Sequence, residues 1–267
     1  MNHNVSSMAH YRRRRRRAGN VRWLLLLLFF LACAVGGYFF GQSPLFNISK
    51  IEVSGLNALT EEDVILHSGI SVGEHIYKIN TNLAAKLIAT DPWVKSVTVK
   101  RRLPSTIQIN VTERVVVAMV PYTNGVLQVD AEGYVLKTQK LLDGMPLMIL
   151  AGISDIPADV LPGQQLESDS LKKGLSMVAV LTQDAAGIIS EIDVSDTQQI
   201  IVQNIYGVEW RVGDGSNFMN KFKIANQITA DEEAAGRLGQ IVYIDVSLMD
   251  KPTIAYRKSG SYATGTE

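Results

Sequence analysis

The sequence predicts an α+β protein with an N-terminal transmembrane helix, a compact β-α-α-β-β domain and a mainly antiparallel β domain with two helices. Three observations carry this prediction: an uncharged apolar run near the N-terminus, a change of apolar spacing from helical to alternating near residue 94, and short alternating strands beyond residue 114. The expected segments are a basic cytoplasmic tail (1–22), the transmembrane helix (23–40), the first domain (45–114), the β domain (115–258) and a disordered tail (259–267).

The apolar run at 23–40 contains 18 residues and no charge. At about 1.5 Å of rise per residue, a helix of that length just crosses a hydrocarbon core. Trp23 and Tyr38 take positions typical of interfacial aromatic residues. The Ala-Cys-Ala segment at 32–34 leaves two alternatives, cleavage of a signal peptide and lipid attachment at Cys33. Because apolar residues continue to position 40, the run favours an uncleaved anchor.

Seven arginines precede this run, and no acidic residue precedes Glu52. Without them the chain has 19 basic and 26 acidic residues, a net charge of −7. Arginines beside a membrane span stay in the cytoplasm, which predicts a cytoplasmic N-terminus and an extracytoplasmic remainder. A basic block can also bind nucleic acid, but its place beside the apolar run favours a role in topology. These residues are Arg12, Arg13, Arg14, Arg15, Arg16, Arg17 and Arg22.

The elements of the first domain follow from local signals. A strand is expected over 46–53, and Thr60 with three following carboxylates predicts a helix that ends at Gly69. Thr81 is expected to cap a second helix, which Asp91-Pro92 ends. Alternating apolar residues then predict two strands around a turn at 103–105.

Beyond residue 114 the chain alternates mainly as strands, with turns at Asn124-Gly125 and Glu132-Gly133. The expected strands are 115–120, 126–130, 134–138, 188–194, 199–202, 208–212, 240–246 and 253–257, and the expected helices are 168–181 and 217–230. The chain has one cysteine, Cys33, so no disulfide is expected outside the membrane.

The stretch 91–114, DPWVKSVTVKRRLPSTIQINVTER, closely resembles the end of the POTRA domain in the FtsQ/DivIB family of bacterial cell-division proteins. Residues 46–55, FNISKIEVSG, resemble its beginning, and 126–136, 212–228 and 243–247 continue the resemblance. The similarity is thin across 141–184. The resemblance implies the fold described above, with Trp93 as a packing anchor, Pro104 in a hairpin turn and Glu113-Arg114 as a charged exit. Lys100-Arg101-Arg102 is interpreted either as a solvated face or as a contact with headgroups or an acidic partner.

No catalytic constellation is expected. Ser170-Leu171-Lys172-Lys173 matches the S-x-x-K pattern of penicillin-recognising enzymes, but the companion motifs are missing. We expect Ser168 or Ser170 to cap a helix instead. The four histidines are too scattered for a metal site. These histidines are His3, His10, His67 and His75. The sequence therefore predicts a protein that is not an enzyme and that has no cofactor, metal, nucleic acid or small-molecule substrate.

The resemblance implies a single-pass scaffold of the divisome in the inner (cytoplasmic) membrane at the septum, which binds FtsB/DivIC and FtsL and helps control septal peptidoglycan synthesis. The resemblance implies that the main contact with these partners is made by strand addition at the end of the β domain. This implies partner-binding residues on the final strand and the strand before it: Ser247, Leu248, Thr253, Ile254, Ala255 and Tyr256. Tyr256 is the expected anchor, with the alternative that Ile254 and Tyr256 face the core.

One further surface and one rival class of protein stay open. The first strand of the POTRA domain is a candidate edge for other division proteins. A POTRA-bearing secretion or outer-membrane assembly factor is the rival class, although such a protein normally has several POTRA repeats or a following barrel.

Overall fold

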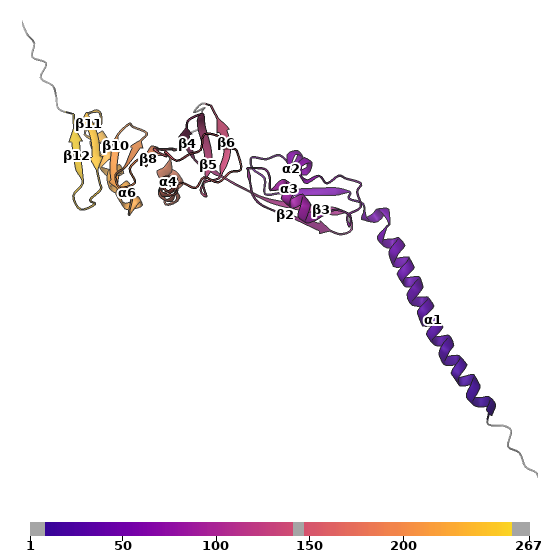
Figure 1. Ribbon diagram of the computed structural model, residues 1–267. Helices are drawn as coiled ribbons and strands as arrows, with labels where there is room; N and C mark the ends of the chain where they lie inside the picture. Colours follow the sequence, from indigo (N-terminus) through magenta and orange to yellow (C-terminus); the bar gives the residue numbers. More distant parts are fainter. Residues whose placement is uncertain (1–8, 141–146, 258–267) are drawn as a thin grey trace, which may run out of the picture. The chain divides into compact units, whose positions relative to one another are not determined.

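The computed structural model describes residues 9–140 and 147–257 (Figure 1). The predicted disordered tail at 259–267 lies outside the described residues. The first element is the helix α1 (Ala9–Gly41), and its part Val21–Gly41 is long and apolar enough to cross a membrane. Among the described residues it is the one helix with that length and composition.

Helix α1 begins well before the predicted transmembrane segment, so the basic tail at 12–17 is helical rather than separate from the span. Arginine is a good helix former, and no proline interrupts residues 9–41. The backbone therefore continues the helix through the arginine block. The side chain of Arg22 is exposed.

The next elements occur in the predicted order β-α-α-β-β. They are β1 (Lys50–Ser54), α2 (Glu61–Ser68), α3 (Thr81–Ile88), β2 (Val94–Arg102) and β3 (Thr106–Glu113). The strand order in the sheet is β1-β3-β2, with β1 parallel to β3. Ile48, Ile76, Ile107 and Ile109 are buried, so alternate residues of β3 supply the core that the sequence predicted.

Two boundaries in this region differ from the predictions. Residues Pro44–Phe46 form the 3-10 turn η1, which Ser43 caps and in which proline suits the first position because it has no backbone N–H. The turn takes up the start of the predicted strand, so β1 begins at Lys50. The cap of α3 is Asn80 rather than Thr81, because its Oδ1 accepts the backbone N–H of Leu83 at 3.1 Å. The cap of α2 is Thr60, as predicted, and its Oγ1 accepts the N–H of Asp63 at 3.2 Å.

The remaining strands form a nine-stranded sheet in the order β12-β11-β10-β9-β8-β7-β4-β5-β6. Most neighbours are antiparallel, whereas β4–β7, β7–β8 and β10–β11 are parallel. The strands are β4 (Val116–Tyr122), β5 (Gly125–Asp130), β6 (Val135–Gln139), β7 (Ile149–Ala151), β8 (Ile189–Asp193), β9 (Ile200–Asn204), β10 (Glu209–Gly213), β11 (Ile241–Asp245) and β12 (Thr253–Tyr256). The helical elements are α4 (Asp169–Ala179), α5 (Gln183–Ala186), α6 (Phe218–Ala234) and the 3-10 turn η2 (Leu238–Gln240).

The sequence analysis missed β7 and α5. With three residues, β7 is too short to show an alternating pattern, yet it joins the two halves of the sheet by pairing with β4 and β8. Helix α5 is a single turn of four residues. Both elements lie in or beside the stretch 141–184, where the resemblance is thin.

Helix α6 covers one face of the strands that lead to β12. Trp210 on β10 is fully buried, its ring lies edge-on to Phe222 at 5.7 Å, and its Nε1 donates to Thr229 Oγ1 at 3.1 Å. Trp210 is a large buried side chain, and its one polar atom is hydrogen-bonded to α6. These contacts fix α6 against β10. The outer strands β11 and β12 are therefore supported from this side.

Candidate protein-binding edge of the β domain

Strand β12 is the last strand of the nine-stranded sheet and pairs on one side only, with β11. Thr253 lies opposite Asp245, Ile254 opposite Ile244, and Ala255 opposite Tyr243. Among the described residues no strand pairs with the other side of β12. A strand with one free side presents unpaired N–H and C=O groups that an added strand can complete.

The two faces of β12 differ. Ile254 lies in register with Ile244 and, through it, with Trp210, so it points to the core under α6. Thr253 and Ala255 belong to the opposite face, which α6 does not cover. The alternative that Ile254 faces the core is correct for this residue, which packs against the buried cluster.

Tyr256 is 43% exposed, and its hydroxyl belongs to a polar cluster at the end of α6. Arg237 donates to Glu232 through Nη2 at 2.6 Å and through Nε at 2.9 Å, and the phenol of Tyr256 interacts electrostatically with both residues. The hydrogen bond from Arg237 holds the pKa of Glu232 below its ordinary value and keeps the pKa of Arg237 raised. Tyr256 is thus held at its hydroxyl while part of its ring stays in solvent.

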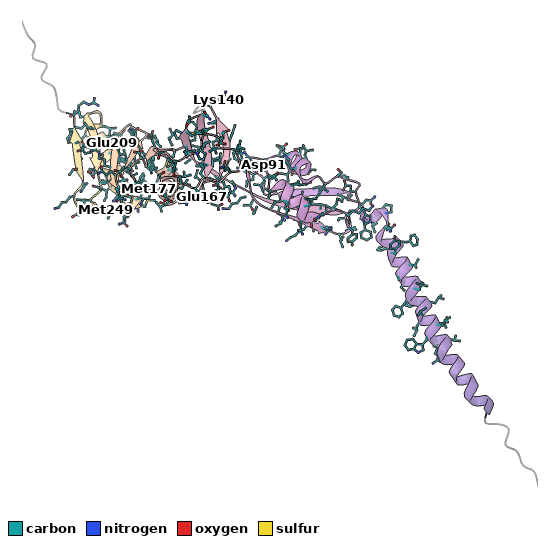
Figure 2. The ribbon with its side chains drawn as sticks, viewed as in Figure 1. Asp91, Lys140, Glu167, Met177, Glu209 and Met249 are labelled. Carbon is teal, nitrogen blue, oxygen red and sulfur yellow. The ribbon has the colours of Figure 1, made fainter. Side chains whose placement is uncertain are left out.

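Ser247 and Leu248 lie in the loop after β11, not on the strand, because β11 ends at Asp245. Ser247 donates to Asp245 Oδ1 through its backbone N at 2.9 Å and its Oγ at 2.6 Å, which ends the strand with a tight turn. Leu248 is exposed, as is Met249 in the same loop (Figure 2). The predicted residues therefore divide between the strand and an adjoining apolar loop.

The uncovered face also contains a pair that the sequence analysis missed. The guanidinium of Arg211 on β10 stacks on the ring of Tyr243 on β11 at 3.6 Å, and its Nε donates to Glu209 Oε1 at 2.8 Å. The hydrogen bond to Glu209 raises the pKa of Arg211. Alternation predicts the face of each residue but not that β10 and β11 are parallel neighbours, so no local signal joins the pair.

A groove borders this pair and reaches Ser247. Its volume is about 560 Å³. The lining residues are Gln198, Gln199, Ile200, Ile201, Arg211, Gly213, Asp245 and Ser247. The groove lies at the start of β9 and the ends of β10 and β11, and β12 contributes no residue to it.

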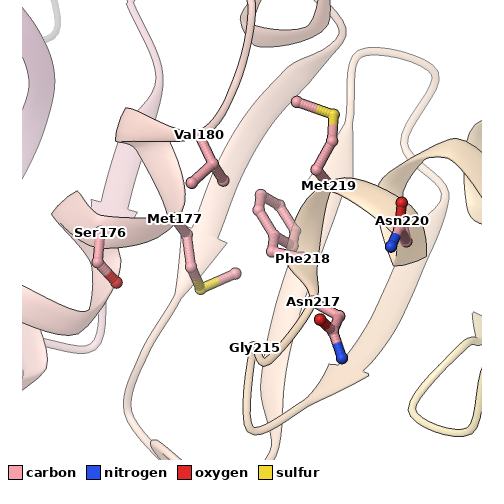
Figure 3. A pocket seen from close by; sticks show the side chains of 8 residues that line it. All are labelled: Ser176, Met177, Val180, Gly215, Asn217, Phe218, Met219 and Asn220. Atoms are coloured by element: carbon pink, nitrogen blue, oxygen red, sulfur yellow. The ribbon is translucent and has the colours of Figure 1, made fainter.

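A second pocket, of about 280 Å³, lies between α4 and the start of α6 (Figure 3). Met177 and Phe218 supply its apolar wall. None of its residues is acidic, basic or a thiol; they are Ser176, Met177, Val180, Gly215, Asn217, Phe218, Met219 and Asn220. Its one hydroxyl, that of Ser176, donates to the carbonyl of Lys173 at 2.6 Å.

The S-x-x-K pattern lies at a helix cap, as predicted. Ser168 is the cap of α4, because its Oγ accepts the N–H of Leu171 at 3.2 Å. The same Oγ donates to Asp155 at 2.7 Å and lies 2.9 Å from the Oγ of Ser170. Among the described residues no group of three or more His, Cys, Asp or Glu side chains could hold a metal.

The charged exit at Glu113-Arg114 is held on both sides. Burial raises the pKa of Glu113, but backbone N–H groups of residues 57–59, at 2.7 to 3.0 Å, outweigh it and the pKa is lowered. Arg114 bonds to Asp130 at 2.5 Å and to Glu132 at 3.0 Å, and it stacks on Tyr134. Trp93, the expected packing anchor, is half-buried, and its carbonyl accepts the N–H of Arg114 at 2.8 Å.

Comparisons with known proteins agree with this architecture. A family model described as "POTRA domain, FtsQ-type" matches residues 46–114. DivIB of Clostridium acetobutylicum is 26% identical over 219 residues, which cover 80% of this chain and 85% of that protein. FtsQ of Syntrophotalea carbinolica is 28% identical over 81% of this chain and 76% of that protein. FtsQ of Corynebacterium glutamicum is 33% identical over 45% of this chain and 53% of that protein.

A solved structure of the major extracytoplasmic domain of DivIB from Geobacillus stearothermophilus is also similar. Its TM-score is 0.33 and its sequence identity 21%, over 45% of this chain and 93% of that domain.

An FtsQ-type POTRA domain, one apolar helix of membrane-spanning length and a β domain with a free edge define a single-pass membrane protein with a POTRA module. The chain is similar to the FtsQ and DivIB cell-division proteins over about four fifths of its length, as its sequence predicted.

Proposed function

We propose that this protein is a scaffold of the divisome that binds FtsB/DivIC-like and FtsL-like single-pass proteins and thereby helps control septal peptidoglycan synthesis. The observation that carries the proposal is the free edge of β12, with Tyr256 half-exposed at its end and exposed apolar residues in the loop before it. Protein binding fits the chain better than catalysis, because neither pocket described above contains a catalytic constellation.

The proposed location is the cytoplasmic (inner) membrane at the division septum, with the N-terminus in the cytoplasm. Seven arginines precede the span, whereas Lys50 is the one basic residue in the first 20 after Gly41. Basic residues close to a span favour the cytoplasmic side, so this asymmetry supports an extracytoplasmic POTRA domain and β domain.

In the proposed complex, a partner strand lies along the outer side of β12. Backbone hydrogen bonds supply much of the affinity, and side chains at alternate positions supply specificity. On one face the added strand lies beside Thr253 and Ala255, and the Arg211–Tyr243 stack lies farther across the same face of the sheet, on β10 and β11. On the other face it meets the exposed part of the Tyr256 ring.

The free edge of the POTRA sheet is a second proposed contact. Strand β1 lies at the end of the order β1-β3-β2, and its residues are exposed or half-exposed. We assign this edge to other members of the divisome, whereas β12 is assigned to the FtsB/DivIC-like and FtsL-like partners.

The test is co-purification of the full-length protein with its FtsB/DivIC-like and FtsL-like partners after co-expression in the source bacterium. The wild-type chain is expected to retain both partners, and Tyr256→Ala is expected to lose them. Tyr206→Ala is the matched control, because Tyr206 is a similarly exposed tyrosine in the turn between β9 and β10. Failure of the wild-type chain to retain either partner would contradict the proposed function.

A further inference from the structure

The end of the POTRA domain that follows α1 is tied to the last turn of that helix. Eight residues separate Gly41, the end of α1, from Lys50, the start of β1. His75 Nε2 lies 2.9 Å from the carbonyl oxygen of Gly41. The ring of Phe46 packs edge-on against Phe40 at 5.5 Å and lies tilted against the ring of Tyr77 at 5.6 Å. This end therefore lies at the membrane surface wherever α1 spans a membrane.

Three segments that are distant in sequence meet at this end. Ile48 N donates to the carbonyl of Glu74 at 2.8 Å, and Ile76 N donates to the carbonyl of Phe46 at 2.9 Å. The hydroxyls of Ser49 and Ser105 are 2.8 Å apart, which places the β2–β3 turn beside the start of β1. We call the exposed residues of these segments (44–50, 71–78 and 100–105) the membrane-proximal surface.

Large apolar side chains on this surface are exposed among the described residues. Leu45, Val72, Tyr77 and Leu103 are each more than half exposed, and each segment contributes at least one of them. Isolated exposed apolar residues are ordinary, but four at one end of a small domain indicate a contact. At the level of the lipid headgroups, these leucine, valine and tyrosine side chains can bury part of their exposed apolar area against lipid.

The same surface is basic. It contains Lys50, Lys78, Lys100, Arg101 and Arg102, against one carboxylate, that of Glu74. Glu52 nearby on β1 bonds to Lys50 at 2.8 Å and lies 3.8 Å from Arg102, so these two are partly neutralised. Lys78 and Lys100 have no carboxylate within 4.0 Å among the described residues.

Arg101 holds the surface together while remaining cationic. Its Nε donates to the carbonyl of Ile76 at 2.9 Å, and its Nη2 donates to that of Ile79. The opposite charge gathers at the start of α2, where Glu61, Glu62 and Asp63 are exposed. Residues 57–59, just before α2, bond to Glu113 at the end of β3, whereas the β2–β3 turn lies at the start of β3. The domain therefore has a basic end beside the membrane and an acidic helix start at the other end of that strand.

We propose that the membrane-proximal surface docks on anionic phospholipid headgroups of the leaflet from which α1 emerges. Basic side chains near an anionic leaflet are attracted to it, and interleaved apolar residues add burial, which together form a peripheral lipid contact. Continuity with the span favours lipid over a protein occupant, because α1 holds this surface against the headgroups without further binding. The contact goes beyond the scaffold function, since it sets how the POTRA domain stands on the membrane.

The test uses the full-length chain in nanodiscs, with Cys33→Ala and a single environment-sensitive fluorophore on Leu103→Cys. Discs of zwitterionic lipid alone are compared with discs containing anionic phosphatidylglycerol. With the anionic lipid, emission is expected to shift to the blue and to be quenched by lipids that carry a spin label near the headgroup. Both effects are expected to decrease in high salt, because the attraction is screened.

Variants that remove a positive charge distinguish docking on anionic lipid from a position merely close to the membrane. Lys78→Gln with Lys100→Gln is expected to lower the ratio of docked to undocked protein about fivefold for each lysine. Lys86→Gln, an equally solvated lysine toward the far end of α3, is the matched control and is expected to change nothing. Equal emission in both lipids, or insensitivity to salt in the unaltered lysine background, would overturn the proposal. A label on Glu62→Cys that responds as strongly as the label on Leu103→Cys would also overturn it.

Discussion

The two ends of the nine-stranded sheet, β6 and β12, are treated differently by the chain. At β6 a loop covers the edge: Val135 N donates to the carbonyl of Gln164 at 2.9 Å, and the carbonyl of Val135 accepts the N–H of Gly163 at 2.7 Å. Leu166 N adds a bond to the carbonyl of Gly133 at 2.9 Å. These bonds use the outward backbone groups at the start of β6, so the loop covers this part of the edge.

At β12 the described residues provide no comparable cover. Its buried face is secured by Ile254 and by Tyr256 at the end of α6, while its outer side remains without a neighbour. Unprotected edges promote unwanted association, and β6 shows one way in which this chain avoids it. An edge left open in the same sheet therefore indicates use as a binding surface.

The largest expected effect is on partner affinity at β12. Tyr256→Ala should weaken binding of the FtsB/DivIC-like protein by about 30-fold or more, as for an aromatic residue at the centre of an interface. Lys137→Ala, an exposed position on β6, should leave the affinity unchanged. Titration of the full-length variants with the purified partner in detergent measures both constants. Equal losses at the two edges would remove the contrast between them.

The next effect concerns the cover over β6. Gly163 has a φ of 89°, which a β-branched residue adopts only with strain. Gly163→Val should lower the free energy of unfolding by about 1–3 kcal/mol and raise aggregation, because the loop then releases the edge of β6. Urea unfolding and light scattering check the two results. An unchanged aggregation rate in a measurably destabilised variant would show that the loop does not protect this edge.

A smaller effect is expected at the support of Tyr256. Arg237→Ala removes both hydrogen bonds to Glu232 and one partner of the Tyr256 hydroxyl, so the ring becomes less ordered. Partner affinity should fall about two- to fivefold, which is less than for Tyr256→Ala. The same titration measures it, with Lys251→Ala, an exposed cation in the β11–β12 loop, as the charge-matched control.

The smallest effect is a pH dependence with a defined sign. The pKa of Glu232 is lowered in the folded protein from 4.5, so its contribution to stability is present above that value and is lost as pH falls through the folded pKa. Partner affinity should stay level from pH 7 down to about 4.5 and decline below that value. The decline should be shallower in Glu232→Gln, in which no carboxylate titrates at that position. Glu132→Gln, in the β5–β6 turn, should keep the wild-type profile.

Most of the POTRA fold could be predicted because its signals are local. A hydroxyl cap at Thr60, a left-handed Gly69 and strict alternation in β3 each act within a few residues. The error at α3 has the same local scale, since asparagine at 80 is a better cap than the threonine that follows it.

The β domain was harder because strand order is a long-range property. Alternation placed β10, β11 and β12 but could not show that β10 and β11 run parallel, and so could not bring Arg211 onto Tyr243. The partner-binding residues came from resemblance rather than from pattern. The structure adds that Ile254 faces the core, that Ser247 and Leu248 belong to a loop, and that Tyr256 has a polar anchor.

The most direct measurement of the central claim is hydrogen–deuterium exchange of the full-length protein with and without its FtsB/DivIC-like partner. Strand addition predicts that backbone amides at 253–256 become protected in the complex, because their outer groups gain partners. Amides at 135–139 on β6 should exchange at the same rate in both states. Binding without protection at β12, or with protection at β6 instead, would contradict the account.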